Sequence, residues 1–225
     1  MHVKGIHVKR EDTVVLDGVS FDVEDGKVIS LLGPSGIGKT TLLRVIAGLD
    51  RADRGTVTDD DDEPFARTDV GVVYQDYPLL RHRTVEDNLM VAARIADIDH
   101  EAARARVRDL LAQVGLEDRG DHYPAQLSGG QRQRAAIAQQ LVLPRRLLLL
   151  DEPFSGLDYE AIASVQDLIR SVERTTVVLV THDVHAANGV SHALVRLGAT
   201  GKKGGARVVS VENLERRSGA SGKAA

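Results

Sequence analysis

The sequence predicts an α/β domain with a mainly parallel sheet, an N-terminal antiparallel β part and an inserted all-helical segment. Short apolar runs alternate with turns or helical patterns on either side of residues 80–142, whereas within that range apolar residues recur at helical spacing. The run Leu147–Leu150 is apolar at every position, which is typical of a parallel strand covered on both faces. We therefore expect one domain over 1–217, with a core of about 1–79 and 143–217, a helical subdomain of about 80–142 and a disordered tail at 218–225.

The strands are predicted from short apolar runs bounded by turn residues. Asp25-Gly26 supplies a turn between two of these runs, and the last two runs flank a glycine-rich segment and are expected to form a hairpin. The predicted strands cover 14–16, 19–23, 28–32, 70–74, 147–150, 177–180, 193–197 and 207–211.

The helices are predicted from apolar residues that recur three and four positions apart. Gly48 and Gly115 end two of them, because glycine readily takes the left-handed conformation found at helix C-termini. Thr84 and Asp87 resemble a capping box at the start of the helical segment. The predicted helices cover 40–47, 103–114, 131–141 and 162–172.

Four consecutive aspartates, Asp59–Asp62, are followed by Glu63. We interpret this run as a solvated loop at a hairpin tip rather than as a metal site, since divalent cations are usually held by ligands spread over a shaped loop.

Composition excludes several classes of protein. The chain has 225 residues, no cysteine and a net charge of −4, which excludes disulfide scaffolds, thiol catalysis and cysteine-bound zinc and argues against a broadly basic nucleic-acid binder. No apolar stretch approaches the roughly 18 residues of a membrane helix, and the N-terminus lacks the apolar region of a signal peptide. We expect a protein inside the cell that has no nucleic-acid partner and relies on another chain for any membrane crossing.

A glycine-rich loop follows the strand predicted at 28–32. Gly33-Pro34-Ser35-Gly36-Ile37-Gly38-Lys39-Thr40 fits the pattern G-x-x-x-x-G-K-[ST] between a strand and a helix, and a chance match in this setting is improbable. Glycines allow successive backbone N–H groups to surround a phosphate, and the helix N-terminus adds positive potential. Lys39 then reaches the β- and γ-phosphates and Thr40 ligates Mg²⁺, while the adjacent Thr41 completes the expected nucleotide contacts.

Two carboxylates follow the buried strand at 147–150. Asp151 and Glu152 lie where ligands bind in an open α/β sheet, at the carboxyl ends of the strands. We expect Asp151 to hold Mg²⁺ and Glu152 to act as general base on the attacking water. In a chain that lacked the glycine-rich loop at 33–40, which we call the phosphate loop, the simpler interpretation would be that Asp151 and Glu152 only end a strand in solvent.

A second glycine motif, Leu127-Ser128-Gly129-Gly130-Gln131, precedes a predicted helix and can also bind an anion. With this motif in place, the sequence resembles the nucleotide-binding domain of the ATP-binding cassette (ABC) family over about residues 3–212. Leu127–Gln131 matches the family signature and Asp151-Glu152 its Walker B motif. The other matches, in family order, are Gln75 to the Q-loop, Ser155–Asp158 to the D-loop and His182 to the switch histidine.

The resemblance implies that two such domains pack head to tail and bury two ATP molecules. Ser128, Gly129, Gly130 and Gln131 of one copy would close over the γ-phosphate held by the phosphate loop of the other. Gln75 would ligate Mg²⁺ or water and report nucleotide to the helical subdomain, and His182 would contact the γ-phosphate and the attacking water. Asp158 would cross the interface, although a helix N-cap is an equally physical role for it.

One position departs from the family pattern. The family usually carries an aromatic residue about 25–30 positions before the loop lysine, where it stacks on adenine, and Arg10 occupies that position here. Either its guanidinium stacks on the base or Arg10 is a solvated surface residue.

A single cassette resembles the ATPase subunit of a membrane transporter, peripheral on the cytoplasmic face of the cell membrane. The implied activity is hydrolysis of ATP to ADP and phosphate with Mg²⁺. The implied partners are a second copy or a paralogous ATPase subunit, integral membrane permease subunits and a substrate-binding protein. Residues 79–85, 123–126 and 152–154 look most like importers of the nitrate, sulfonate and taurine group. An exporter or lipoprotein- or peptide-release ATPase, and an ATPase acting on a soluble partner, remain alternatives. The transported molecule is not defined by this subunit.

Overall fold

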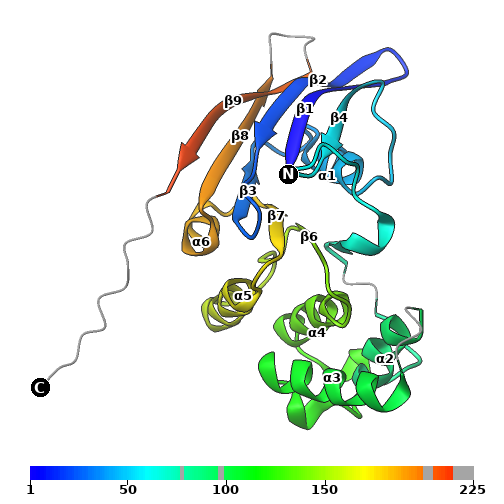
Figure 1. The fold of residues 1–225 in the computed structure, drawn as a ribbon. Coiled ribbons are helices and arrows are strands. Elements are labelled where there is room, and N and C mark those ends of the chain that lie inside the picture. Colours follow the sequence, from blue (N-terminus) through cyan, green and yellow to red (C-terminus); the bar gives the residue numbers. More distant parts are fainter. Residues whose placement is uncertain (77–78, 96–98, 200–204, 215–225) are drawn as a thin grey trace, which may run out of the picture.

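The structure, a computed structural model, describes residues 1–76, 79–95, 99–199 and 205–214 (Figure 1). These form a nine-stranded sheet in the order β4-β1-β2-β9-β8-β3-β7-β6-β5. The strands are β1 (His2–Arg10), β2 (Thr13–Asp22), β3 (Val28–Leu32), β4 (Arg54–Thr58), β5 (Val70–Val73), β6 (Leu147–Asp151), β7 (Thr176–Val180), β8 (Ala193–Ala199) and β9 (Ala206–Asn213). The helices are α1 (Lys39–Ile46), α2 (Val85–Ile95), α3 (His100–Gln113), α4 (Gly129–Leu141), α5 (Tyr159–Ser171) and α6 (Val184–Val190).

The centre of the sheet is parallel and its N-terminal part is antiparallel, which confirms the predicted fold class. Strands β8, β3, β7, β6 and β5 pair in parallel, whereas β1 pairs antiparallel with both β2 and β4. Alternate residues of β6 enter different hydrophobic clusters: Leu148 and Leu150 face one cluster, and Leu147 and Leu149 face the other. Both faces of β6 are therefore buried, which is why every one of these positions is apolar.

The helical insertion consists of α2, α3 and α4, which lie together at one end of the molecule in Figure 1. Their shared core includes Leu89, Val107 and Leu110, all nearly or fully buried. Thr84 Oγ1 accepts a hydrogen bond from the Asp87 backbone N–H at 3.1 Å, so Thr84 stabilises the start of α2. The domain boundaries remain a prediction, and the tail predicted at 218–225 lies outside the described residues.

Three elements were not anticipated from the sequence: β1, β4 and α6. Strand β4 is polar and largely exposed, and it is a strand because its backbone pairs with β1, with Val57 opposite Val3. The loop that follows is not a hairpin tip, because the next strand, β5, lies at the opposite edge of the sheet.

The prediction that Asp59–Asp62 is a uniformly solvated run is wrong for Asp59, which is 3% exposed. Its carboxylate accepts hydrogen bonds from the backbone N–H groups of Asp61 and Glu63, both at 3.0 Å, and lies 2.8 Å from the guanidinium of Arg146. The hydrogen bond from the Glu63 backbone N–H contributes most to holding the pKa of Asp59 below its usual value, and Arg146 contributes less. Asp59 therefore joins the end of the β4 strand to the residue just before β6.

We expect Asp59→Asn to lower the melting temperature at neutral pH by a few degrees, because the Arg146 pairing and two charge-assisted hydrogen bonds are lost. A carboxylate with a lowered folded pKa contributes stability above its unfolded pKa of about 4, and that stability is lost as pH falls through the folded pKa. The difference from the wild type should therefore shrink below about pH 4. Thermal denaturation against pH measures this, with exposed Asp61→Asn as control; a pH-independent difference contradicts it.

Candidate functional site

The phosphate loop connects β3 to α1 in the conformation that its glycines allow. Gly36 and Gly38 have φ of 77° and 108°, in the left-handed region that favours glycine. A Cβ on Gly38 would also lie 3.1 Å from side-chain atoms of Val15 and Leu16. Gly38 is the N-cap of α1 and supplies no side-chain cap, so the first N–H groups of this helix remain available to an anion.

Lys39 is buried within this loop. Its ammonium donates hydrogen bonds to the carbonyl oxygens of Gly33 and Pro34 at 2.8 and 3.1 Å. The cation thus lies against its own loop, where it contacts neutral acceptors rather than a carboxylate.

A cavity of about 290 Å³ lies beside the loop. It brings together most of the residues predicted to bind nucleotide and metal, from the loop, the end of β6 and the second residue after β5. These are Ser35, Gly36, Gly38, Lys39, Thr40, Thr41, Gln75, Asp151 and Glu152. Gly33, Pro34 and Ile37 do not line the cavity; the first two instead hold Lys39.

Asp151 ends β6 next to Thr40. The Thr40 hydroxyl donates to Asp151 Oδ2 at 3.2 Å, while the buried Asp151 Oδ1 has no hydrogen-bond partner among the described residues. Burial raises the pKa of Asp151, and the neighbouring Glu152 carboxylate acts in the same direction. A partly satisfied carboxylate, a hydroxyl and the Gln75 amide at one cavity form an oxygen donor set that fits a small divalent cation.

Asp151→Asn should stabilise the nucleotide-free chain, because it removes a desolvated charge that lacks a full set of partners. We expect the melting temperature to rise by about 2–4 °C, which corresponds to ~1 kcal/mol in a chain of this size. Thermal denaturation without nucleotide or metal measures this. Asp109→Asn, on the exposed side of α3, should leave it unchanged. A melting temperature that falls would mean that the Asp151 carboxylate is stabilising.

Glu152 and His182 lie side by side at the ends of β6 and β7. His182 Nδ1 is 2.9 Å from Glu152 Oε2, within hydrogen-bond distance. Glu152 has a φ of 51°, which is unusual for a residue with a side chain and is held here by its backbone N–H donating to Val180 O at 2.8 Å. The side chain is therefore aimed at the cavity by a strained turn.

The second glycine motif forms the N-terminus of α4. Ser128 Oγ accepts from the Gln131 N–H at 3.2 Å, and Gln131 Oε1 accepts from the Ser128 N–H at 2.9 Å, which is a capping box. Gly130 is buried against α5, where a Cβ would lie 2.8 Å from that of Ala161. Asp158 caps α5 by accepting from the Ala161 N–H at 2.8 Å, the structural role that was left open for it. None of these residues lines the cavity of about 290 Å³ beside the phosphate loop, which we call the phosphate cavity.

The residues gathered at this site agree with what a comparison of the chain with models of known protein families finds. The family model described as ABC transporter matches residues 16–155, which include the phosphate loop, the capped signature turn and the Asp151-Glu152 pair. The chain belongs to the ABC transporter family.

Two curated relatives within the ABC transporter family are named as import ATP-binding proteins. The chain is 42% identical to the sulfate/thiosulfate import ATP-binding protein of Nephroselmis olivacea, over 80% of this chain and 54% of that protein. It is 40% identical to the spermidine/putrescine import ATP-binding protein of Nitratidesulfovibrio vulgaris, over 87% of this chain and 55% of that protein. The chain thus spans about half the length of these curated relatives. The narrower resemblance to nitrate, sulfonate and taurine importers remains a prediction.

A solved ABC transporter cassette has the same fold. The dimeric post-hydrolysis structure of the ATP-binding cassette MJ0796 with ADP and Pi matches with a TM-score of 0.80 and 29% identity, covering 95% of this chain and 98% of that one. No helix in the described part of the present chain has the length and apolarity to cross a bilayer.

Arg10, the residue at the family's adenine-stacking position, is engaged elsewhere in this ABC transporter chain. Its guanidinium lies 3.0 Å from Asp50 Oδ2, and the hydrogen bond from Arg44, more than that from Arg10, lowers the pKa of Asp50. Arg10 is absent from the lining of the phosphate cavity. Val15 and Val180 do line it, and neither was predicted. Apolar strand residues carry no chemical signal in the sequence, so only the fold reveals them.

Proposed function

We propose that this chain binds ATP and hydrolyses it to ADP and phosphate. The observation that carries the proposal is the convergence of Lys39, Asp151 and Glu152 on one cavity at the carboxyl end of the sheet. His182 does not line this cavity itself, but its Nδ1 lies 2.9 Å from Glu152 Oε2. The relationship to a cassette solved with ADP and Pi supports it.

Each residue of the site would have its own role in binding and hydrolysing ATP. Lys39 would exchange its two carbonyl acceptors for β- and γ-phosphate oxygens, and the N–H groups of the loop and of α1 would surround the remaining charge. Glu152 would accept the proton of the attacking water, and His182, which contacts it, would orient both water and γ-phosphate. Thr40, Asp151 and Gln75 would hold Mg²⁺, which neutralises charge on the phosphates when bound.

Lys39→Ala tests the phosphate-loop assignment. A hydrogen bond to a charged group contributes about 1.5–3 kcal/mol, so losing it should weaken ATP binding at least tenfold and depress hydrolysis with it. Fluorescent-nucleotide titration measures the affinity. Lys9→Ala, on the exposed end of β1, is the matched control. Unchanged ATP affinity in Lys39→Ala would remove Lys39 from the site.

We further propose that two copies, or this chain and a paralogous ATPase subunit, enclose ATP head to tail. Ser128–Gln131 and Asp158 lie outside the chain's own phosphate cavity, and the exposed hydroxyl of Ser128 is then available to the γ-phosphate of the opposite copy. The related cassette was solved as a dimer, which supports this arrangement.

Transport of a small solute into the cell is the process that this ATPase would power. Both relatives described above are import ATP-binding proteins. A groove of about 320 Å³, lined by residues that include Leu79, Pro124 and Arg132, lies at the helical insertion, and Leu80 and Tyr123 beside these residues are large, exposed hydrophobics. We propose that this groove receives a short cytoplasmic helix of the permease subunits. The chain would then lie on the inner face of the membrane, with a substrate-binding protein outside.

Affinity purification of tagged Glu152→Gln protein from detergent-solubilised membranes with ATP and Mg²⁺ tests the partners. A permease together with a substrate-binding protein is expected. A permease with large extracytoplasmic domains would instead indicate an exporter or release ATPase. Recovery of soluble chains alone would contradict the transport proposal.

A further inference from the structure

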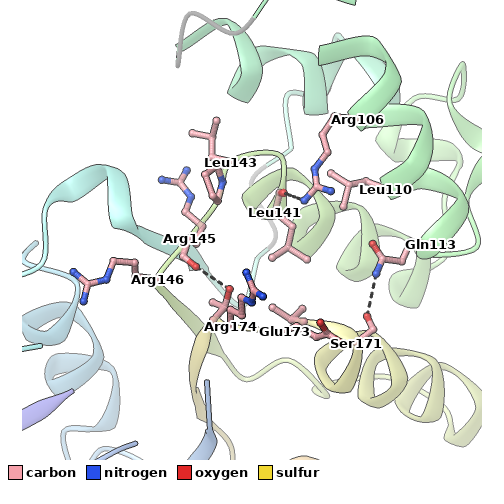
Figure 2. A pocket seen from close by; sticks show the side chains of 13 residues that line it. Arg106, Leu110, Gln113, Leu141, Leu143, Arg145, Arg146, Ser171, Glu173 and Arg174 are labelled. Carbon is pink, nitrogen blue, oxygen red and sulfur yellow. Dashed lines mark hydrogen bonds between the residues drawn. The ribbon is translucent and has the colours of Figure 1, made fainter. Parts of the chain in front are cut away.

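A second, larger cavity lies at the amino ends of β6 and β7, away from the phosphate loop. Its volume is about 650 Å³, and it is bordered by α3 and the end of α4 on one side and by the segment from Ser171 to Thr175 on the other (Figure 2). The cavity therefore spans the joint between the helical insertion and the sheet core. Its volume is within the range of ligand-binding cavities, about 300–1,000 Å³.

Four arginines line this cavity, and three of them form no ion pair with a carboxylate among the described residues. Arg146 is committed to Asp59, at 2.8 Å, and in Figure 2 it extends away from the other labelled side chains. Arg106 donates to the carbonyl oxygen of Leu141 at 3.1 Å. Arg145 donates to the carbonyl oxygens of Gln140, at 3.2 Å, and of Thr68.

Capping of α4 accounts for part of this arrangement. The carbonyls of Gln140 and Leu141 belong to the last turn of that helix, where arginine side chains stabilise acceptors that lack partners within the helix. Capping leaves further N–H groups on both guanidiniums, because each arginine has five donors. Burial lowers the pKa of Arg145, and the charge of the Asp69 carboxylate opposes this only in part.

Arg174, unlike Arg106 and Arg145, does not cap α4. No hydrogen bond or ion pair joins its side chain to any residue in the described part of the chain, yet it lines the same cavity. Glu173 is the single carboxylate among the lining residues, so the unpaired guanidiniums outnumber it. Gln113 Nε2 donates to Ser171 Oγ at 3.4 Å across the same joint and retains a second N–H, whereas the Ser171 hydroxyl donates to the Leu168 carbonyl oxygen at 2.8 Å.

We infer that this cavity binds a small phosphate-bearing metabolite between Arg106, Arg145 and Arg174. Guanidinium groups bind phosphate oxygens in bidentate pairs, and three of them suit a ligand with more than one negative charge. The same ligand would join α3 to the core. It would lie at one end of β6 and β7, whose other ends, at Asp151 and Val180, line the phosphate cavity, and so it is positioned to act as an effector of that site.

Isothermal titration with inorganic pyrophosphate tests the inference. The titration uses Lys39→Ala protein, so that the phosphate loop contributes little, and it reads binding rather than hydrolysis, so it stands apart from the proposed ATPase activity. We expect one site whose affinity falls at least tenfold in Arg174→Gln, a change that removes no hydrogen bond or ion pair among the described residues. Arg106→Gln should have a similar effect, whereas Arg108→Gln, exposed on the same helix and outside the cavity, should have none.

Two results would overturn the inference. One is the absence of binding heat in the Lys39→Ala protein. The other is binding that is equal in Arg174→Gln, Arg106→Gln and Arg108→Gln, which would place pyrophosphate elsewhere on the molecule.

Discussion

Glu152→Gln should reduce the rate of ATP hydrolysis by about 10²–10⁴-fold while ATP still binds, since that is the usual contribution of a positioned general base. The amide is nearly the same size as the carboxylate but cannot accept the proton of the attacking water. The residues that we propose to hold the phosphates, Lys39 above all, are unchanged. Phosphate release under saturating ATP measures the rate, and nucleotide titration measures the affinity.

The local geometry makes this variant a clean test. Glu152 reaches the cavity from a strained turn with φ of 51°, fixed by a backbone hydrogen bond that the substitution does not alter. A Gln side chain can still pair with His182, so the fold and the position of the side chain should be retained. Glu101→Gln, exposed at the start of α3, is the matched control. Hydrolysis at the wild-type rate in Glu152→Gln would exclude Glu152 as the base.

Ser128→Arg should abolish the ATP-dependent dimer and leave ATP binding by the single chain intact. Ser128 is exposed and lies outside the phosphate cavity of its own chain, so a long cation there obstructs only an approaching partner. Size-exclusion chromatography with light scattering, on the Glu152→Gln background with ATP, distinguishes monomer from dimer. A dimer that persists in Ser128→Arg would contradict the head-to-tail arrangement.

Ser128→Ala separates the two effects of Ser128→Arg, which are the loss of the helix cap and the addition of a long side chain. The Ser128 hydroxyl caps α4, and loss of an N-cap costs about 0.5–2 kcal/mol of stability in either variant. If lost capping alone prevented dimer formation, alanine would prevent it as fully as arginine. We expect the alanine variant to dimerise more weakly than the wild type but still detectably, since it presents no bulk to the partner.

The features that the sequence predicted are those in which one local pattern has one physical solution. A short unbroken apolar run that ends in a charged residue favours a strand buried on both faces, and β6 is such a strand. The phosphate loop needs glycine at positions that adopt left-handed φ, and Gly36 and Gly38 do so. In both cases the residue types alone indicate the local backbone conformation.

The features that were missed depend on neighbours distant in the sequence. Strand β4 is polar and follows from pairing with β1, and Asp59 is buried because Arg146 comes from the segment before β6. Val15 meets the phosphate cavity only once β2 lies beside the loop. Arg10 is an exposed residue that pairs with Asp50, a residue that no local pattern connects to it.

The internal hydrogen bonds of Lys39 bear on the entropy of nucleotide binding. The ammonium is held within the loop by the carbonyl oxygens of Gly33 and Pro34, at 2.8 and 3.1 Å. In the proposed complex with ATP, a phosphate would meet a lysine whose position the loop already fixes, so little side-chain freedom would remain to be lost on binding. The nucleotide would then replace neutral acceptors by charged ones around a fixed ammonium, and the affinity of the loop would arise mainly from that exchange.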